Sequence, residues 1–349
     1  MSRKKLPVIV VSGFLGSGKT SLLSRVLQSP SMAHTSVIVN EFGKIGLDHH
    51  LLSQVEERTI LLGGGCLCCS TREDLVEAFL KILNERQQGT GERIDRIVIE
   101  TTGLADPSPI FFTLLRHPVL QHHFEVERIV VTVDAVNGLF HLERHEESIK
   151  QAAVADRLII TKTDIAEPEQ VERLAERLRL LNPSAVITVS EPDNSDAAEW
   201  FVGPMPAAGH EGQREPVGLA CLDKSENGGI QPHSLEGNDT RSISVEFREP
   251  LEWHAFGLWL SMLLHAHGTN CLRVKGLLDL GGEGPVSLNG VQHIIHPPEH
   301  LSRWPNEENV SRIVFITRGI EPKRILDSLL AFQSMLGAVP KLSEMQYAL

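Results

Sequence analysis

Residues 8–20 read VIVVSGFLGSGKT, and from Gly13 to Thr20 they complete the pattern G-x-x-x-x-G-K-[ST]. The pattern follows an apolar β-branched run and precedes a helical stretch, Lys19–Gln28, which is the strand–loop–helix context in which it binds phosphate. Its glycines let backbone N–H groups converge on phosphate oxygens, and the helix N-terminus adds its dipole. We expect a nucleotide-binding loop made of Gly13, Phe14, Leu15, Gly16, Ser17, Gly18, Lys19, Thr20 and Ser21.

Two groups of this loop have expected catalytic roles, and a third residue joins them from a later strand. Lys19 is expected to reach the β- and γ-phosphates, and the Thr20 hydroxyl to hold Mg²⁺, a hard cation that prefers oxygen ligands. Glu100 ends the apolar run Ile97–Ile99 and is expected to lie near the same Mg²⁺. Gly103 follows and permits the backbone to approach the γ-phosphate, as in nucleotide switches.

The segment that is expected to select the nucleotide base is Thr161-Lys162-Thr163-Asp164, which follows the apolar run Arg157–Ile160. GTPases carry N-K-x-D at this place, and its carboxylate accepts two hydrogen bonds that guanine donates and adenine does not. Asp164 and Lys162 are present here, whereas Thr161 replaces the Asn. The tetrapeptide favours GTP, although a Lys and an Asp in an ordinary surface turn would read the same.

Three of the five cysteines stand together at Cys66, Cys68 and Cys69, after three consecutive glycines. Thiolates suit Zn²⁺ and tolerate Co²⁺, and the glycines permit the tight backbone that convergence of three thiols needs. A transient redox disulfide and buried structural cysteines are the alternatives. We favour a transition-metal site. Cys221 and Cys271 are isolated and are expected to be structural.

Length and charge restrict the architecture and the partners. The 349 residues suit two domains, and a formal charge of −12 argues against a mainly electrostatic grip on nucleic acid or anionic membranes. No run of about 18 apolar residues predicts a membrane span, and the first residues do not resemble a signal peptide, so we expect a cytoplasmic protein.

Val/Ile-rich runs alternate with helical stretches in the first half, which predicts an α/β fold with a P-loop, doubly wound, mainly parallel sheet. The expected strands are Val8–Val11, Ser36–Val39, Arg96–Ile99, Arg128–Val133, Arg157–Ile160 and Ala185–Val189, and the expected helices are Lys19–Gln28, Glu73–Arg86 and Glu167–Leu180. The second half predicts a smaller α+β domain. Its expected strands are Ser242–Phe247, Arg273–Leu280, Val286–Leu288, Val291–Ile295 and Arg312–Thr317, its helices are Leu251–Leu264 and Pro322–Phe332, and its turns lie at Gly281-Gly282 and Asn289-Gly290.

These patterns divide the chain into four parts. A P-loop domain with the cysteine motif is expected over residues 1–190, a flexible linker over 191–240, the α+β domain over 241–332 and a tail over 333–349. The linker range is rich in Gly and Pro and shows little periodicity.

The motifs follow one another in an order that resembles the CobW/YjiA family of metal-related GTPases, over roughly residues 7–332. The segments that carry the resemblance are Gly13–Thr20, Asn40–Gly43, Gly65–Cys69, Glu100–Gly103, Ala105–Pro109, Thr161–Asp164, Arg273–Gly276, Val291–His293 and Arg312–Ile316. The resemblance implies a GTP-hydrolysing metallochaperone or metal-site maturation factor that binds Zn²⁺ and serves a client metalloprotein.

The resemblance also places Asn40–Asp48 in a nucleotide-responsive loop beside the metal motif. Glu41 or Asp48 would contact Mg²⁺ through water or orient the attacking water. Relatives carry acidic residues where this chain has Val39 and Lys44, so an extra carboxylate ligand from this loop is not expected. His117 is an accessory-ligand candidate.

The leading hypothesis is therefore a slow GTPase that couples hydrolysis to metal delivery, because neither an arginine finger nor a catalytic Gln is identifiable. Two alternatives come from other classes. One is a regulatory module that senses nucleotide and metal without significant turnover, and the other is an ATP-dependent phosphotransferase for a small molecule.

Overall fold

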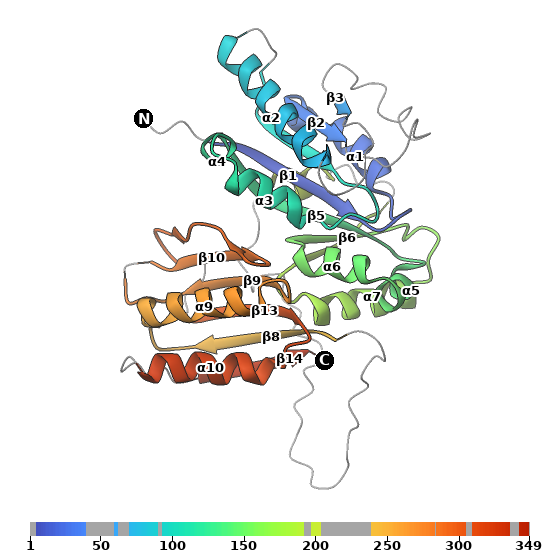
Figure 1. The fold of residues 1–349 in the computed structure, drawn as a ribbon. Coiled ribbons are helices and arrows are strands. Elements are labelled where there is room, and N and C mark those ends of the chain that lie inside the picture. The colour runs from blue at the N-terminus through green and yellow to red at the C-terminus, as the bar shows by residue number, and fades with distance from the viewer. Residues whose placement is uncertain are drawn as a thin grey trace.

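The computed structural model describes residues 5–39, 59–61, 70–89, 93–191, 197–203, 239–282, 284–304, 309–335 and 342–348. These residues form two sheets, each with its own helices (Figure 1). Among the described helices, none combines the length and the apolarity that crossing a membrane requires.

The first sheet has seven strands in the order β3-β2-β4-β1-β5-β6-β7, and every pairing in it is parallel. The strands are β1 (Leu6–Gly13), β2 (Thr35–Val39), β3 (Thr59–Leu61), β4 (Arg96–Glu100), β5 (Phe124–Asp134), β6 (Arg157–Thr161) and β7 (Val186–Val189). The predicted doubly wound parallel sheet is confirmed.

Both faces of this sheet are buried, as the near-continuous apolar strands predict. Alternate residues of β1 enter different cores: Val8 and Val10 face one, and Ile9 and Val11 the other. The first core is closed by α2 (Ser70–Gln88), α3 (Ser108–Arg116), α4 (Leu120–His123), α5 (Gly138–Arg144), α6 (Glu146–Val154) and α7 (Pro168–Leu181). The second is closed by α1 (Lys19–Leu27), the short 3₁₀ turn η1 (Pro30–Met32) and α8 (Glu199–Val202).

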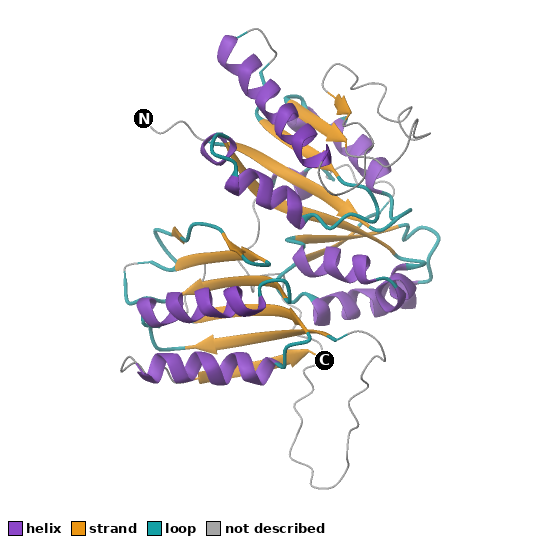
Figure 2. Cartoon of the chain, viewed as in Figure 1, coloured by secondary structure: helices purple, strands orange, loops and turns teal. Residues whose placement is uncertain are grey.

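The second sheet is antiparallel, and its main path runs β11-β10-β9-β13-β8-β14 with β12 paired to β10. Its strands are β8 (Thr240–Phe247), β9 (Cys271–Leu278), β10 (Val286–Val291), β11 (Ile294–Ile295), β12 (Glu299–His300), β13 (Ser311–Arg318) and β14 (Leu342–Ala348). Two helices, α9 (Trp253–His267) and α10 (Pro322–Met335), cover one face (Figure 2). The expected smaller α+β domain is confirmed.

The predicted turn at Asn289-Gly290 is wrong, because both residues lie inside β10 and pair with Lys275 and Val274 of β9. A Cβ at Gly290 would lie 2.4 Å from the Ile295 side chain, so the glycine serves a close approach inside the sheet. The chain turns instead after β10, where Gln292 adopts a positive φ of 52°.

Part of the expected linker is packed on the first sheet. Residues 197–203 include α8, and its Trp200 and Phe201 are buried in the second core of that sheet. Residues 192–196 and 204–238 lie outside the described part of the chain. Within the expected tail, β14 pairs with β8.

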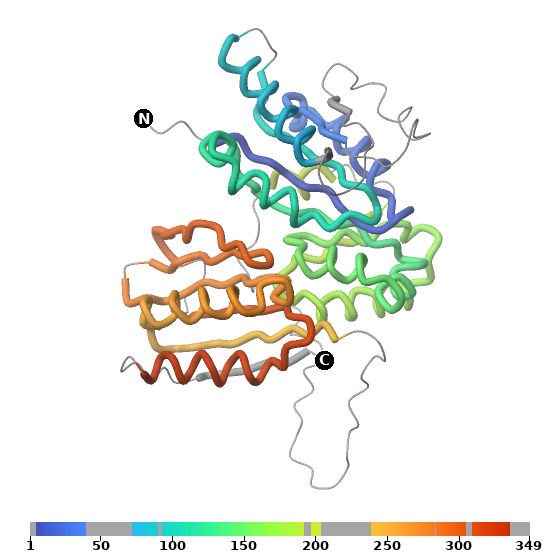
Figure 3. The backbone as a smooth tube through the Cα atoms, viewed as in Figure 1, coloured from blue at the N-terminus to red at the C-terminus, as the bar shows by residue number. Residues whose placement is uncertain are grey.

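The two sheets meet through α6 and α7, which Figure 3 shows in green beside the orange C-terminal strands. Ala153 of α6 packs with Leu272, Val314 and Ile316 of the antiparallel sheet. The Ser242 hydroxyl donates to the Leu180 carbonyl at 2.6 Å. This apolar and hydrogen-bonded contact fixes the C-terminal domain against the helices of the P-loop domain.

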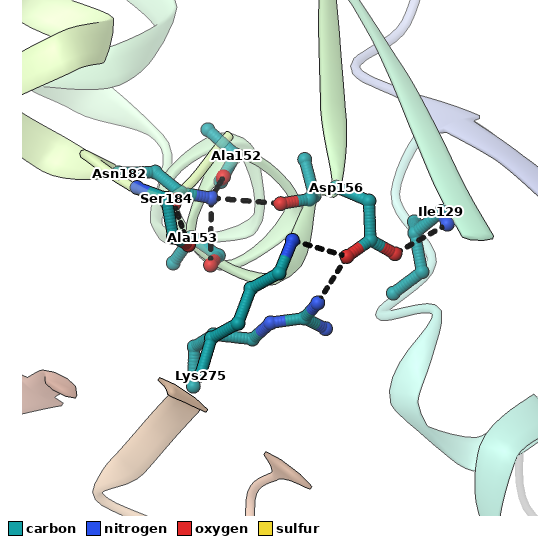
Figure 4. Close-up of polar contacts among 9 residues, drawn as sticks. Ile129, Ala152, Ala153, Asp156, Asn182, Ser184 and Lys275 are labelled. Carbon is teal, nitrogen blue, oxygen red and sulfur yellow. Dashed lines mark hydrogen bonds and ion pairs between the residues drawn. The ribbon is translucent and has the colours of Figure 1, made fainter. Parts of the chain in front are cut away.

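A buried carboxylate adds charge pairing to the same interface. Asp156, immediately before β6, accepts hydrogen bonds from Arg273 and Lys275 of β9, the latter at 3.3 Å. Figure 4 shows the Lys275 ammonium directed at the Asp156 carboxylate. Burial acts to raise the pKa of Asp156, but the two neighbouring cations outweigh it and hold that pKa below its usual value.

Candidate nucleotide-binding site

The loop after β1 has a backbone that requires its glycines. Gly13 has a φ of 141°, and a Cβ there would lie 2.4 Å from the Thr132 hydroxyl oxygen and 2.5 Å from the Thr132 carbonyl oxygen. Gly16 and Gly18 also have positive φ values, 70° and 86°. Such values suit glycine and few other residues, so the spacing of glycines in the sequence motif reflects the path of the chain.

Side chains hold the loop from within the first sheet. The Ser17 and Thr132 hydroxyls lie 2.6 Å apart. The Lys19 ammonium donates to the carbonyls of Gly13 at 2.9 Å and Phe14 at 3.1 Å, so it lies over the loop where phosphate oxygens are expected.

Thr20 and Glu100 are brought together, although they stand 80 positions apart in the chain. The Thr20 hydroxyl donates to Glu100 Oε1 at 2.6 Å, because β1 and β4 are neighbours with Val11 opposite Glu100. The Glu100 side chain is buried, and the two oxygens at the end of the sheet form the hard donor set that Mg²⁺ prefers. The residues present therefore fit a magnesium ion.

The segment after β4 lies directly on the P-loop. A Cβ at Gly103 would lie 2.7 Å from the backbone N and Cα of Leu15, so only a glycine fits there without a shift. Gln151 of α6 fixes this approach: its side-chain amide donates to the Gly103 carbonyl at 3.1 Å and the Ala105 carbonyl at 3.0 Å. Sequence reasoning missed Gln151, a polar residue on the buried face of a short amphipathic helix.

At the expected binding site for the nucleotide base, Thr161 contacts a backbone carbonyl and Lys162 contacts a carboxylate. The Thr161 hydroxyl donates to the Ser17 carbonyl at 2.7 Å, which ties the end of β6 to the P-loop. Lys162, with a φ of 58°, donates to Asp134 Oδ2 at 2.7 Å. The Asp164 side chain is exposed.

Asp134 is a second residue that sequence reasoning missed. Burial acts to raise its pKa, but hydrogen bonds from Lys162, Asn137 and the Val136 backbone outweigh burial and lower that pKa below its ordinary value. Asp134 therefore stays ionised at neutral pH and anchors Lys162 at the end of the sheet.

Phe14 of the P-loop packs against two neighbouring histidines, whose ring centroids lie 5.8 Å apart. Its ring centroid is 4.5 Å from that of His141 and 4.6 Å from that of His145. Burial and the neighbouring His145 lower the pKa of His141, so it is neutral at physiological pH. These aromatic contacts support the loop from the side of α5 and α6.

The expected transition-metal residues Cys66, Cys68 and Cys69 lie outside the described residues, as do Glu41 and Asp48. His117 is described at the end of α3, where its Nδ1 accepts from the backbone N–H groups of Val119 and Leu120, both at 3.3 Å. Within the described ranges, no group of three or more His, Cys, Asp or Glu side chains is placed to hold a metal ion.

Comparison with known proteins gives a consistent result. Residues 7–189 match the family model "CobW/HypB/UreG, nucleotide-binding domain", and residues 240–333 match "Cobalamin synthesis protein cobW C-terminal domain". The chain is 31% identical to the zinc chaperone YjiA of Escherichia coli over 313 residues, which cover 89% of this chain and 93% of that one. It is 32% identical to the zinc-regulated GTPase metalloprotein activator 1 of Saccharomyces cerevisiae over 369 residues, covering 94% and 83%.

A solved structure agrees with the fold. The crystal structure of the Zn(II)-bound YjiA GTPase from E. coli matches with a TM-score of 0.66 and 25% sequence identity, covering 95% of this chain and 99% of that one. Both sheets are therefore part of the shared architecture.

Proposed function

The chain belongs to the CobW/HypB/UreG family, and on that basis we propose that it is a GTP-hydrolysing metallochaperone or metal-site maturation factor. The observation that carries the proposal is the Thr20–Glu100 contact at 2.6 Å beside a complete P-loop, because it brings together two oxygen donors of the kind that suit a nucleotide-bound Mg²⁺. The names of its relatives, zinc chaperone and zinc-regulated GTPase, support a metal-linked role.

The chain's own residues supply positioning and charge for hydrolysis. Lys19 neutralises charge on the β- and γ-phosphates, and the backbone N–H groups of the P-loop hold their oxygens. Mg²⁺, held by Thr20 and Glu100, would neutralise the remaining phosphate charge. The backbone at Gly103 faces the γ-phosphate, and Glu41 or Asp48 orients the attacking water. Intrinsic turnover is expected to be slow, since no sequence motif identifies an arginine finger or a catalytic Gln.

Guanine selection is assigned to Asp164. Its carboxylate accepts two hydrogen bonds from guanine, while Thr161 links this segment to the P-loop at Ser17 and Lys162 is held by Asp134. GTP rather than ATP is therefore the expected substrate.

The transported metal is assigned to Cys66, Cys68 and Cys69, with His117 as an accessory ligand. Zn²⁺ is the expected ion in vitro, and Co²⁺ or another divalent transition metal also suits thiolates. These cysteines lie in sequence between the loop Asn40–Asp48 and Gly103, so loss of the γ-phosphate is expected to change metal affinity and allow delivery to a client metalloprotein.

The decisive experiment measures phosphate released from GTP and from ATP, with and without Zn²⁺ and Co²⁺, in the wild-type protein and in Lys19→Ala. Release from GTP that Lys19→Ala abolishes is the expected result. Binding of GTP without release in every condition would indicate the regulatory module, and a preference for ATP would indicate the phosphotransferase.

Coupling to the metal needs its own measurement. Zn²⁺ affinity is titrated in the protein loaded with GDP, in the protein loaded with a non-hydrolysable GTP analogue, and in Cys68→Ser. Equal affinities in both nucleotide states would end the coupling proposal. An unchanged Zn²⁺ affinity in Cys68→Ser would show that the cysteine cluster is not the metal site.

A further inference from the structure

The segment that precedes α3 and the turn after β10 meet at the interface between the two domains. Asp106 follows Gly103 in the segment that lies on the P-loop, and Gln292 forms the turn between β10 and β11 of the C-terminal domain. The Gln292 side-chain amide donates to Asp106 Oδ2 at 3.0 Å and to the Ser108 hydroxyl at 3.2 Å. The contact joins residues 186 positions apart.

Asp106 links this contact to the start of α3. Its Oδ1 accepts hydrogen bonds from the Ser108 backbone N–H at 2.8 Å and from the Ser108 hydroxyl at 2.5 Å. One carboxylate oxygen therefore organises the first turn of α3 while the other is bound by the C-terminal domain. Moving Gln292 would change the position of Asp106 relative to α3.

Gln292 itself is held in an unfavourable conformation. Its φ of 52° lies in the left-handed region, which side chains other than glycine rarely adopt. The strain is maintained because the preceding Val291 is buried in the core of the P-loop domain and the Gln292 N–H donates to the Leu272 carbonyl at 3.2 Å. Because these two contacts hold the backbone at Gln292, its side chain is directed at Asp106 and Ser108.

Ring contacts prevent the turn from sliding along α3. His293 stacks on Phe112 with ring centroids 4.3 Å apart, and His296 meets the edge of Phe111 at 5.4 Å. The β10–β11 turn is thus seated on α3, and the Gln292–Asp106 contact belongs to a packed interface.

The segment Gly103–Ser108 is consequently held at two ends by two glutamine amides. Gln151 of α6 holds the carbonyls of Gly103 and Ala105, and Gln292 holds Asp106 and Ser108. At its first residue, this segment lies on the backbone of Leu15 in the P-loop. Only two residues, Leu104 and Ala105, separate Asp106 from Gly103.

We propose that Gln292 is a positioning residue for GTP hydrolysis, through which the C-terminal domain sets the placement of Gly103 against the P-loop. The proposal rests on the GTPase activity proposed above and deepens it. Nucleotide binding by the P-loop does not depend on this contact, whereas the hydrolytic step does. A client that binds the C-terminal domain would thereby change the rate of GTP hydrolysis.

The test uses Gln292→Asn in the full chain. Asn tolerates the left-handed region and keeps an amide, but it is one methylene shorter and does not reach Asp106. The matched control is Gln333→Asn, because Gln333 bridges the backbone of Glu252 with its amide inside the C-terminal domain, with both hydrogen bonds at 3.2 Å.

The expected result separates rate from binding. In Gln292→Asn the kcat for phosphate release falls about five- to tenfold while the Kd for GDP changes by less than about twofold. Gln333→Asn leaves kcat within about 1.5-fold of the wild-type value. An unchanged or raised kcat in Gln292→Asn, or an equal loss in both variants, would overturn the proposal.

A double-mutant cycle and a nucleotide-free measurement complete the design. Asp106→Ala removes both carboxylate oxygens and with them the acceptor, so adding Gln292→Asn to it is expected to lower kcat no further. Amide hydrogen exchange of residues 103–108 without nucleotide is expected to rise in Gln292→Asn and not in Gln333→Asn.

The exchange measurement also distinguishes the two proposals. If the wild-type protein released no phosphate, the GTPase proposal would fail while the exchange result still reported whether Gln292 holds the segment. Unchanged exchange in Gln292→Asn would overturn the positioning role whatever the turnover.

Discussion

The P-loop and the segment Gly103–Ser108 lie against each other but are held by different parts of the molecule. The P-loop is fixed within its own sheet, by Thr132 and Thr161 on Ser17 and by the carbonyls that Lys19 bridges. The segment after β4 is fixed by the side chains of Gln151 and Gln292, one from α6 and one from the C-terminal domain. The difference predicts that binding and hydrolysis respond to separate mutations.

Gly13→Ala is expected to have the largest effect, because the added Cβ would collide with the hydroxyl and carbonyl oxygens of Thr132 at 2.4 and 2.5 Å. We expect GTP affinity to fall at least about 100-fold, since the phosphate-binding backbone must move. Isothermal titration with GTP measures it. Gly89→Ala is the control, because Gly89 also has a positive φ, 65°, but has open space around it. Equal losses in both variants would attribute the effect to φ strain and not to the collision.

Gly103→Ala tests the other region. The Cβ would lie within 2.7 Å of the Leu15 backbone, so the segment must withdraw from the P-loop. We expect kcat to fall roughly 100-fold with GDP affinity lowered less than about threefold. Gly257→Ala, in an open position of α9, serves as a control for the substitution itself. If GDP affinity fell as far as kcat, the two regions would not be separable.

Acid is expected to weaken the interface that holds the segment. Burial, and then the charge of Arg273, lower the pKa of His296 from 6.5 to about 4, with Asp156 opposing and Lys5 adding to the shift. The unfolded chain therefore binds a proton between those values that the folded chain does not, so stability is present above pH 6.5 and is lost as the pH falls towards 4. Between pH 7 and pH 5 this lowers the free energy of unfolding by about 2 kcal/mol.

Urea unfolding at the two pH values measures this loss. Asp156 does not itself titrate in this interval, because its lowered pKa keeps the carboxylate ionised throughout. His296→Gln is expected to flatten the pH dependence, and His300→Gln, at an exposed position of β12, to leave it as in the wild type. A slope that His296→Gln does not alter would exclude this histidine as the cause.

Gln151→Met is expected to have the smallest effect of the four, about tenfold on kcat, or roughly 1.4 kcal/mol. The side chain keeps its length but no longer donates to the carbonyls of Gly103 and Ala105. Asn182→Leu is the control, because the Asn182 amide donates to three carbonyls at the end of α6, those of Ala152, Ala153 and Ala155, away from the P-loop. Phosphate-release kinetics and urea unfolding are measured together.

The control should lose at least as much stability as Gln151→Met and keep its kcat. A loss of kcat that followed stability in both variants would show that general loosening, and not the placement of Gly103, limits hydrolysis.

Local patterns in the sequence predicted six of the seven strands of the first sheet, the P-loop and the position of Glu100 at the end of β4, but not β3 or β14. Apolar β-branched runs with no polar alternation require a sheet that is covered on both faces, and the glycine spacing of residues 13–18 requires a loop with positive φ values. The turn predicted at Asn289-Gly290 was wrong because an Asn-Gly pair also fits a strand in which the glycine allows close approach to Ile295.

Gln151, Asp134 and Gln292 were not predictable in the same way, because a single buried or turn polar residue carries no periodic signal. Their roles come from partners at separations of 48, 28 and 186 residues.

The sequence by itself determined the chemical groups available: a glycine-rich loop with Lys19, two oxygen donors in Thr20 and Glu100, and three clustered thiols. The tertiary structure alone decided which distant amides fix the backbone beside the P-loop. The physical reason is that a hydrogen bond depends on placement within about 3 Å, and only the packing of α6 and the C-terminal sheet on the first domain brings Gln151 and Gln292 to that distance.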